Sequence, residues 1–285
     1  MTELGVPHLS IGDEIPNYVC ETTVGQITLH DWIVGSQGLK VGEERYTLIL
    51  TFPPVPDPVT ASDLAWLGSK KARDDIAFRR MNVLGIVCCT MFEFKGFLQN
   101  VPELIEDETW DLTGVPFMAD EDGELHRCLG QVRPGKDDAV RGRVEASITL
   151  LVNPEKEVSL VSTYPFGCGR NFPEIIRAFD SMRITHHFAD LATWANWQPG
   201  GQEGALIQPR FLEDGRILSN EECEEKFPKG YFECLHAWFR ITPIPDLPFD
   251  GLPSNNQDEG DEDKFGGMDV AGILSRPGTA NGLLT

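Results

Sequence analysis

The sequence predicts an α/β fold made of a β-α-β unit followed by a β-β-α unit, and three observations support this prediction. Two continuous apolar runs, 46–52 and 83–89, are typical of strands that are covered on both faces. Between them, segment 61–81 has the three-or-four spacing of a helix, with Leu64, Leu67, Lys71, Asp74 and Phe78 on one face. Farther along, two apolar runs flank a short polar turn and precede a second helical pattern.

The first unit begins after a short strand candidate at 26–29. The helix expected at 61–81 carries Asp63 near its start and Arg79 and Arg80 in its last turn, which suits the helix dipole. A strand, a helix and a second strand in this order predict a parallel pair of strands.

The second unit begins with strands expected at 148–152 and 158–164. The short polar turn between them predicts an antiparallel hairpin. Asn171, with Glu174 three residues later, provides an N-cap signal for a helix that continues to about Met182. This order of elements is that of the thioredoxin fold, so we expect a thioredoxin-like domain at 1–187.

The remainder of the chain differs in composition. Segment 188–247 is rich in Trp, Pro and Gly, with a helix candidate at 220–226 and a short strand at 238–241, and we expect it to pack as a C-terminal arm on the first domain or on a second subunit. Segment 248–285 contains seven acidic and two basic residues, which predicts a disordered acidic tail.

Charge and composition exclude several classes of function. The 285 residues include 24 Lys and Arg against 45 Asp and Glu, a formal net charge of −21, so nucleic acid and anionic membranes are not expected as partners. No apolar run is long enough for membrane insertion, and 1–16 does not resemble a targeting peptide, so we expect a cytoplasmic protein. The seven cysteines lack zinc-site spacing, which favours free thiols, no metal and no cofactor.

Seven short pieces of the sequence, taken in order, resemble the 1-Cys peroxiredoxin family from about Leu9 to Pro245. They are GDEIPN at 12–17, TTVG at 22–25, LHDW at 29–32, VPF at 115–117, DEDGEL at 120–125, YP with GRNF within 164–172, and KFPKG at 226–230. The resemblance implies a peroxiredoxin version of the thioredoxin fold, a thiol peroxidase activity and a homodimer.

The resemblance also implies a peroxide site, in which a cysteine in a Pro-x-x-x-Thr/Ser-x-x-Cys loop opens a helix. The helix N-terminus and an Arg from a distant strand would favour its thiolate. Aligned on Pro53, the family's Thr falls on Asp57 and its cysteine falls on Thr60. The chain has no cysteine between Cys20 and Cys88, so a shift of register would not restore one.

The family's strand Arg is also replaced. Counted back from the turn at 153–154, it falls on Ser147, although a local slip would bring in Arg143. Asp57 adds negative charge where a thiolate would need stabilisation. We therefore expect a vestigial site at Pro53, Asp57, Thr60 and Ser147, with Thr60 as a helix N-cap. The expected function is that of a non-catalytic structural or interaction protein, or of an assembly subunit, that binds protein partners.

An alternative is an active thiol oxidoreductase with a relocated cysteine. Cys168 precedes a helix beside Arg170, and Cys89 ends a strand next to Cys88, although packing is the more frequent role of such thiols.

A phospholipase site is not expected. The glycines around Ser36 are at the wrong offsets for a Gly-x-Ser-x-Gly motif, and the family's histidine, here His30, more often packs. His186 and His187 lack a partner at metal spacing.

Overall fold

The computed structural model describes residues 9–34, 45–105, 107–132, 144–199, 204–208, 216–227, 233–236 and 238–244. The chain divides into two compact units, and the division falls between Arg170 and Asn171. The domain boundary expected at 187 stays a prediction. The expected acidic tail at 248–285 lies outside the described residues.

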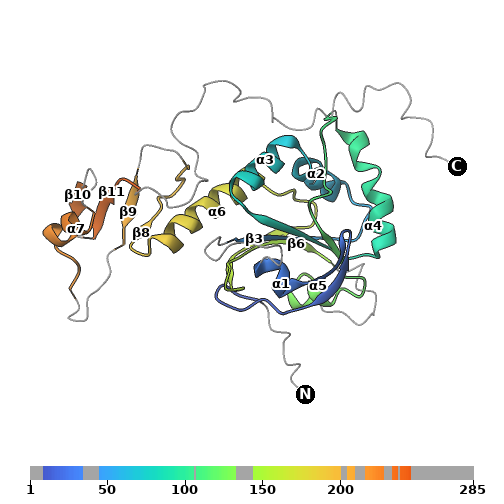
Figure 1. Cartoon of the computed structure of the whole chain (residues 1–285), viewed down its shortest axis with the longest axis horizontal. Helices are drawn as coiled ribbons and strands as arrows, with labels where there is room; N and C mark the ends of the chain where they lie inside the picture. The colour runs from blue at the N-terminus through green and yellow to red at the C-terminus, as the bar shows by residue number, and fades with distance from the viewer. Residues whose placement is uncertain are drawn as a thin grey trace, which may run out of the picture. The chain divides into compact units, whose positions relative to one another are not determined.

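The first unit is built on a seven-stranded sheet with the strand order β2-β1-β5-β4-β3-β6-β7 (Figure 1). Strand β3 is parallel to β4, and β4 is parallel to β5, whereas the other neighbouring pairs are antiparallel. The bounds are β1 (Val19–Thr22), β2 (Gly25–Thr28), β3 (Thr47–Phe52), β4 (Asn82–Val87), β5 (Phe117–Ala119), β6 (Ala146–Val152) and β7 (Val158–Pro165).

Helices cover both faces of this sheet. Figure 1 shows α2 and α3 on one side of it and α1 and α5 on the other. The α1 face is closed by a core that joins Leu29 and Ile33 to Ile49, Leu84 and Ile86 of the sheet. The bounds are α1 (Leu29–Val34), α2 (Pro58–Leu67), α3 (Lys70–Phe78), α4 (Met91–Leu98), a 3-10 helix η1 (Val101–Leu104) and α5 (Glu124–Cys128).

These elements confirm the predicted α/β, thioredoxin-like class. The two buried runs form the parallel pair β3 and β4, and the polar turn joins β6 and β7 as an antiparallel hairpin. Asn171 caps its helix by accepting from the amide of Glu174. The single helix expected at 61–81 is wrong, because Ser69 caps a second helix and Gly68 packs where a Cβ would collide with the ring of Trp110.

The second unit contains α6 (Phe172–His187), α7 (Asn220–Lys226) and a four-stranded antiparallel sheet. Its core includes Ile184, Leu191 and Trp197. The expected helix at 220–226 is confirmed, whereas the sequence indicated one strand where there are four, because strands of two to four residues are too short to show an alternating pattern. The strands are β8 (Leu191–Ala192), β9 (Ala205–Ile207), β10 (Glu233–His236) and β11 (Phe239–Thr242).

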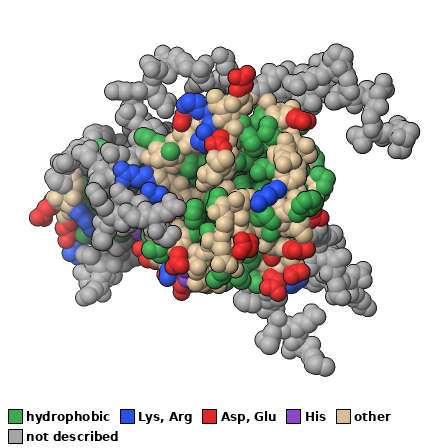
Figure 2. All heavy atoms as spheres, turned by 45° about the vertical axis from the view of Figure 1, so that its right-hand side comes forward, with side chains coloured by type: hydrophobic (Ala, Val, Ile, Leu, Met, Phe, Trp, Pro, Cys, Tyr) green, Lys and Arg blue, Asp and Glu red, His purple; other side chains and the backbone are tan. Residues whose placement is uncertain are grey.

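Among the residues that the structure describes, none of the helices is both long and apolar enough to cross a membrane. Figure 2 shows Asp and Glu side chains spread over the visible face and not gathered in one patch. The net charge of the chain therefore does not mark a single binding surface on that face.

Candidate functional site

The loop at 53–57 leaves the carboxyl end of β3 and enters α2, at the edge of the sheet where the parallel strands end. Ligand sites of α/β folds commonly lie at this edge. Asp57 has extended dihedral angles, φ −141° and ψ 128°, and Pro58 occupies the first helical position. This is a favourable N-terminal arrangement for a helix, since Pro lacks the amide hydrogen that would be unpaired there.

Asp57, and not Thr60, caps this helix. Its Oδ2 accepts from the amide of Thr60 at 2.6 Å and from the Thr60 hydroxyl at 2.7 Å. Both side chains are buried, with Asp57 6% and Thr60 1% exposed. The expectation that Thr60 is the N-cap is wrong, because the helix begins at Pro58 and an acidic side chain is available one residue before it. The Thr60 hydroxyl instead donates a hydrogen bond to the carboxylate of Asp57, the capping residue.

A buried guanidinium lies beside this helix, and Arg170 supplies it. Its Nη1 donates to Asp63 Oδ2 at 2.5 Å, and its Nε donates to the Thr149 hydroxyl at 3.0 Å. Its Nη2 donates to the carbonyl oxygens of Thr51 and, at 3.1 Å, Ile148. The charged group also stacks 4.8 Å from the centre of the Phe52 ring.

The pair of Asp63 and Arg170 is almost completely removed from solvent, with side chains 6% and 1% exposed. Burial raises the pKa of Asp63 and lowers the pKa of Arg170, and the attraction between the two groups opposes both shifts. The hydrogen bonds of the guanidinium connect α2 with β3 and β6. Its role in this structure is therefore to hold these three elements together.

The other predicted parts of the site are separate from this network. Pro53 is buried at the start of the loop. Ser147 lies half-buried on β6, opposite Tyr164 of β7. Arg143, which a slip of register would have brought in, lies outside the described residues.

Comparison with known proteins decides the family. The chain is 30% identical over 226 residues to 1-Cys peroxiredoxin PER1 of Hordeum vulgare, covering 79% of this chain and 92% of the relative. It belongs to the 1-Cys peroxiredoxin family. Peroxiredoxin-6 of Gallus gallus is 26% identical over 245 residues, covering 85% of this chain and all of the relative. No family model matches the sequence.

Solved structures of peroxiredoxins have the same fold. A cysteine-to-serine variant of peroxiredoxin 6 from Arenicola marina superimposes with a TM-score of 0.68 at 25% identity, covering 84% of this chain and 100% of that one. A yeast mitochondrial 1-Cys peroxiredoxin gives a TM-score of 0.64 at 22% identity, covering 82% and 99%. The thioredoxin-like core of the peroxiredoxins is therefore present here.

The cysteines that the structure describes lie outside the loop at 53–57 and outside α2, the two segments that carry Asp57 and Thr60. Cys168 is exposed in the turn after β7, and its amide donates to the Pro165 carbonyl at 2.9 Å. A Cβ on the next residue, Gly169, would lie 3.7 Å from Asp63 Oδ1, so this turn passes beside the first turns of α2. Cys89, the other candidate, is 1% exposed, and Cys88 is fully buried.

The histidines occupy different environments. His30 Nε2 lies 2.6 Å from the carbonyl oxygen of Ile15, whereas Ser36 lies outside the described residues. His186 and His187 end α6 and are exposed. In the described part of the chain, no three His, Cys, Asp or Glu side chains are grouped as a metal site.

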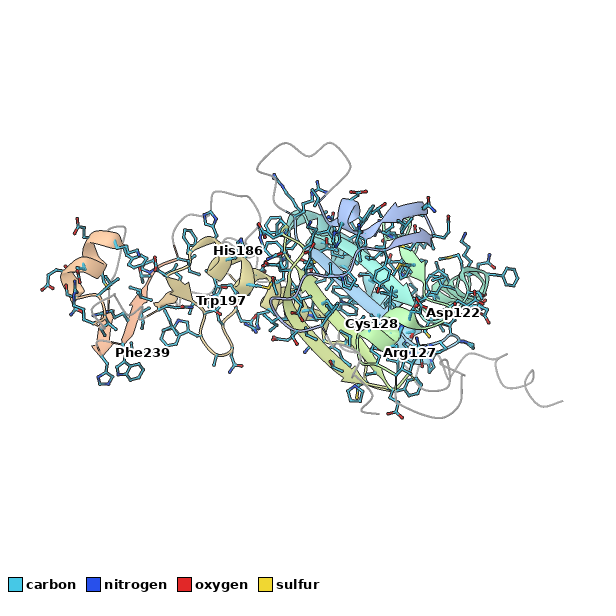
Figure 3. All side chains as sticks on the ribbon, turned by 90° about the horizontal axis from the view of Figure 1, so that it is seen from below. Asp122, Arg127, Cys128, His186, Trp197 and Phe239 are labelled. Carbon is cyan, nitrogen blue, oxygen red and sulfur yellow. The ribbon has the colours of Figure 1, made fainter. Side chains whose placement is uncertain are left out.

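Sequence reasoning missed the pairing of Arg170 with Asp63. It also missed the buried contact of His126 with Asp120. Its only sequence signal is a histidine six residues after the aspartate, within the short helix α5. Figure 3 labels Asp122, Arg127 and Cys128 around the turn and helix that carry the pair.

Proposed function

We propose that this member of the peroxiredoxin family has lost thiol peroxidase activity and works as a non-catalytic interaction protein, as a subunit of a larger assembly. The observation that carries this proposal is the contact between Thr60 and Asp57, at the position where the family resemblance places the reactive cysteine. A threonine hydroxyl becomes a nucleophile only with an effective base, and a carboxylate that caps a helix is a weak one.

The positive charge near the site supports the same proposal. A peroxidatic thiolate needs a cation within contact distance. Arg170 is paired with Asp63, and Ser147 has no charge to offer. Among the described residues, a cysteine placed at position 60 would therefore find Arg170 already paired, and it would have a carboxyl group at position 57 in place of the family's hydroxyl.

The test introduces the missing groups in steps. We expect Thr60→Cys alone to reduce hydrogen peroxide no faster than a free thiol, measured by intact mass and by peroxide consumption. We expect Thr60→Cys combined with Asp57→Thr and Ser147→Arg to react at least tenfold faster. Fast turnover in Thr60→Cys alone would show that the second and third losses are assigned wrongly.

The alternative function, a thiol oxidoreductase with a relocated cysteine, is favoured by one observation: Cys168 is exposed beside the first turns of α2. Stoichiometric oxidation of wild-type protein by peroxide, much faster than that of a free thiol and abolished by Cys168→Ser, would support this alternative and overturn the main proposal. Cys89→Ser is the matched control, because that thiol is buried.

Protein partners are part of the proposal, and two features support it. Strand β7 is an edge of the seven-stranded sheet, a position that can pair with a second copy and form the homodimer expected from the family. Phe92 at the start of α4 is 88% exposed, which is unusual for a large apolar side chain outside an interaction surface. Sedimentation equilibrium of wild type and Phe92→Ser tests which surface mediates association. The cytoplasmic location stays a prediction.

A further inference from the structure

His126 is a buried side chain that the peroxide site does not use. Its ring is completely buried, with Nδ1 2.6 Å from Asp120 Oδ2 and Nε2 3.0 Å from the carbonyl oxygen of Phe52. The amide of His126 donates to the same carboxylate oxygen at 2.9 Å. Phe52 is the last residue of β3 and immediately precedes the loop at 53–57.

Both ring nitrogens therefore face oxygen acceptors. A neutral imidazole has one N–H, so it donates to one of the two oxygens and turns a lone pair toward the other. Neither choice satisfies this site, because a buried lone pair against a carboxylate or a carbonyl is repulsive and loses a hydrogen bond. A ring with two N–H groups satisfies both oxygens and compensates the charge of Asp120.

We propose that His126 is held as an imidazolium paired with ionised Asp120 at neutral pH, and that this proton clamps the end of β3 to α5. No covalent step is involved, since one proton from solvent is bound on folding. Although burial alone would raise the pKa of Asp120, the hydrogen bonds from the His126 ring and amide lower it overall. The carboxylate thus stays ionised beside the ring.

Other ionisable groups lie near the pair on neighbouring elements. Tyr18, which leads into β1, has a raised pKa because of burial first, with Cys128, Asp120 and Glu124 adding to the shift. Because its pKa is raised, Tyr18 is an uncharged neighbour at neutral pH. On the β3 side, the Arg170 guanidinium stacks on the Phe52 ring, and its charge is compensated by Asp63. The negative charges here favour the second ring proton.

The clamp has a defined pH dependence. Because the folded-state pKa of Asp120 is lowered, its contribution to stability is present above the ordinary Asp value of about 4 and is lost as pH falls through the lower, folded-state value. On the alkaline side, removal of the ring proton leaves His126 with one donor for two acceptors. Phe52 O then keeps only the 3.2 Å hydrogen bond from the amide of Cys88. The start of the 53–57 loop should loosen.

The test is ring ¹⁵N NMR on the full-length protein labelled in histidine. We expect both ring nitrogens of His126 to carry a proton at pH 7, because each faces an oxygen acceptor. In Asp120→Asn, the amide can donate to Nδ1, so the ring should carry one proton at the same pH. Asp122→Asn removes an equal charge two residues away on an exposed side chain and should leave two protons on the ring.

One ring proton on His126 in the wild-type protein at pH 7 would overturn the proposal, and so would an identical spectrum in Asp120→Asn. If Asp120→Asn does not fold, the wild-type measurement alone decides. Amide hydrogen exchange at Cys88 offers a second measurement: protection should fall at least tenfold at the pH where the ring loses its proton. This inference does not depend on whether the protein has peroxidase activity.

Discussion

The buried pair of Asp63 and Arg170 offers the most direct test of how this fold is stabilised. We expect Arg170→Met to lower the free energy of unfolding by about 3–5 kcal/mol, the usual cost of leaving one member of a buried ion pair without its partner. In this variant the Asp63 carboxylate, 6% exposed, keeps its burial but loses its cation. The carbonyl oxygens of Thr51 and Ile148 also lose a donor.

The assay is urea unfolding followed by tryptophan fluorescence, with ΔG obtained by linear extrapolation. The matched control is Lys70→Met, which removes a cation from the Lys70–Asp74 pair on α3, where the side chains are 67% and 65% exposed. An exposed pair of this kind contributes about 0.3–0.5 kcal/mol. Arg170→Lys should lie between the two, because an ammonium keeps the charge but not the planar set of donors.

A double variant separates the pair from its surroundings. Asp63→Leu combined with Arg170→Met should be more stable than the sum of the two single losses predicts, since no unpaired charge remains buried. If Arg170→Met costs no more than Lys70→Met, the claim that this guanidinium is committed to holding α2 against β3 and β6 is refuted. Arg170 would then be available to a cysteine at position 60, against the proposed loss of activity.

Two further predictions follow from packing and exposure. Gly85→Ala would place a Cβ 2.2 Å from the ring of Phe117 and should lower the free energy of unfolding by about 1–3 kcal/mol. Gly96→Ala, on an open helix surface, should raise the free energy of unfolding by about 0.5–1 kcal/mol. Equal urea midpoints for the two variants would contradict this difference. Iodoacetamide should alkylate the exposed Cys168 long before Cys20, because burial is the main cause that raises the pKa of Cys20 to about 11. The extent of Cys20 labelling should therefore keep rising toward pH 11. Peptide mapping that finds Cys20 modified before Cys168 at pH 8 would refute this prediction.

The sequence was a reliable guide wherever a structure depends on neighbouring residues. Runs of apolar residues predicted β3 and β4, the polar turn predicted the hairpin, and Asn171 with Glu174 predicted the start of α6. The prediction that Thr60 stands at the position of the family's cysteine is of the same local kind, because it needs only a loop pattern and the positions of the cysteines. The sequence pattern gave the wrong start for α2 and missed the break after Leu67. At these two positions, capping by Asp57 and the contact of Gly68 with Trp110 decide the structure, and the spacing of apolar residues does not.

Sequence alone determined the class of the fold, the family and the absence of sulfur at the position that opens α2. Tertiary structure alone decided which groups meet there: Arg170 reaches Asp63 across 107 positions of the chain, and His126 reaches the carbonyl of Phe52 across 74. The physical reason is that helix caps, turns and apolar periods are properties of adjacent residues. Contacts between distant polar groups depend on the strand order and register, and a buried charge is tolerated only where that register brings it a partner.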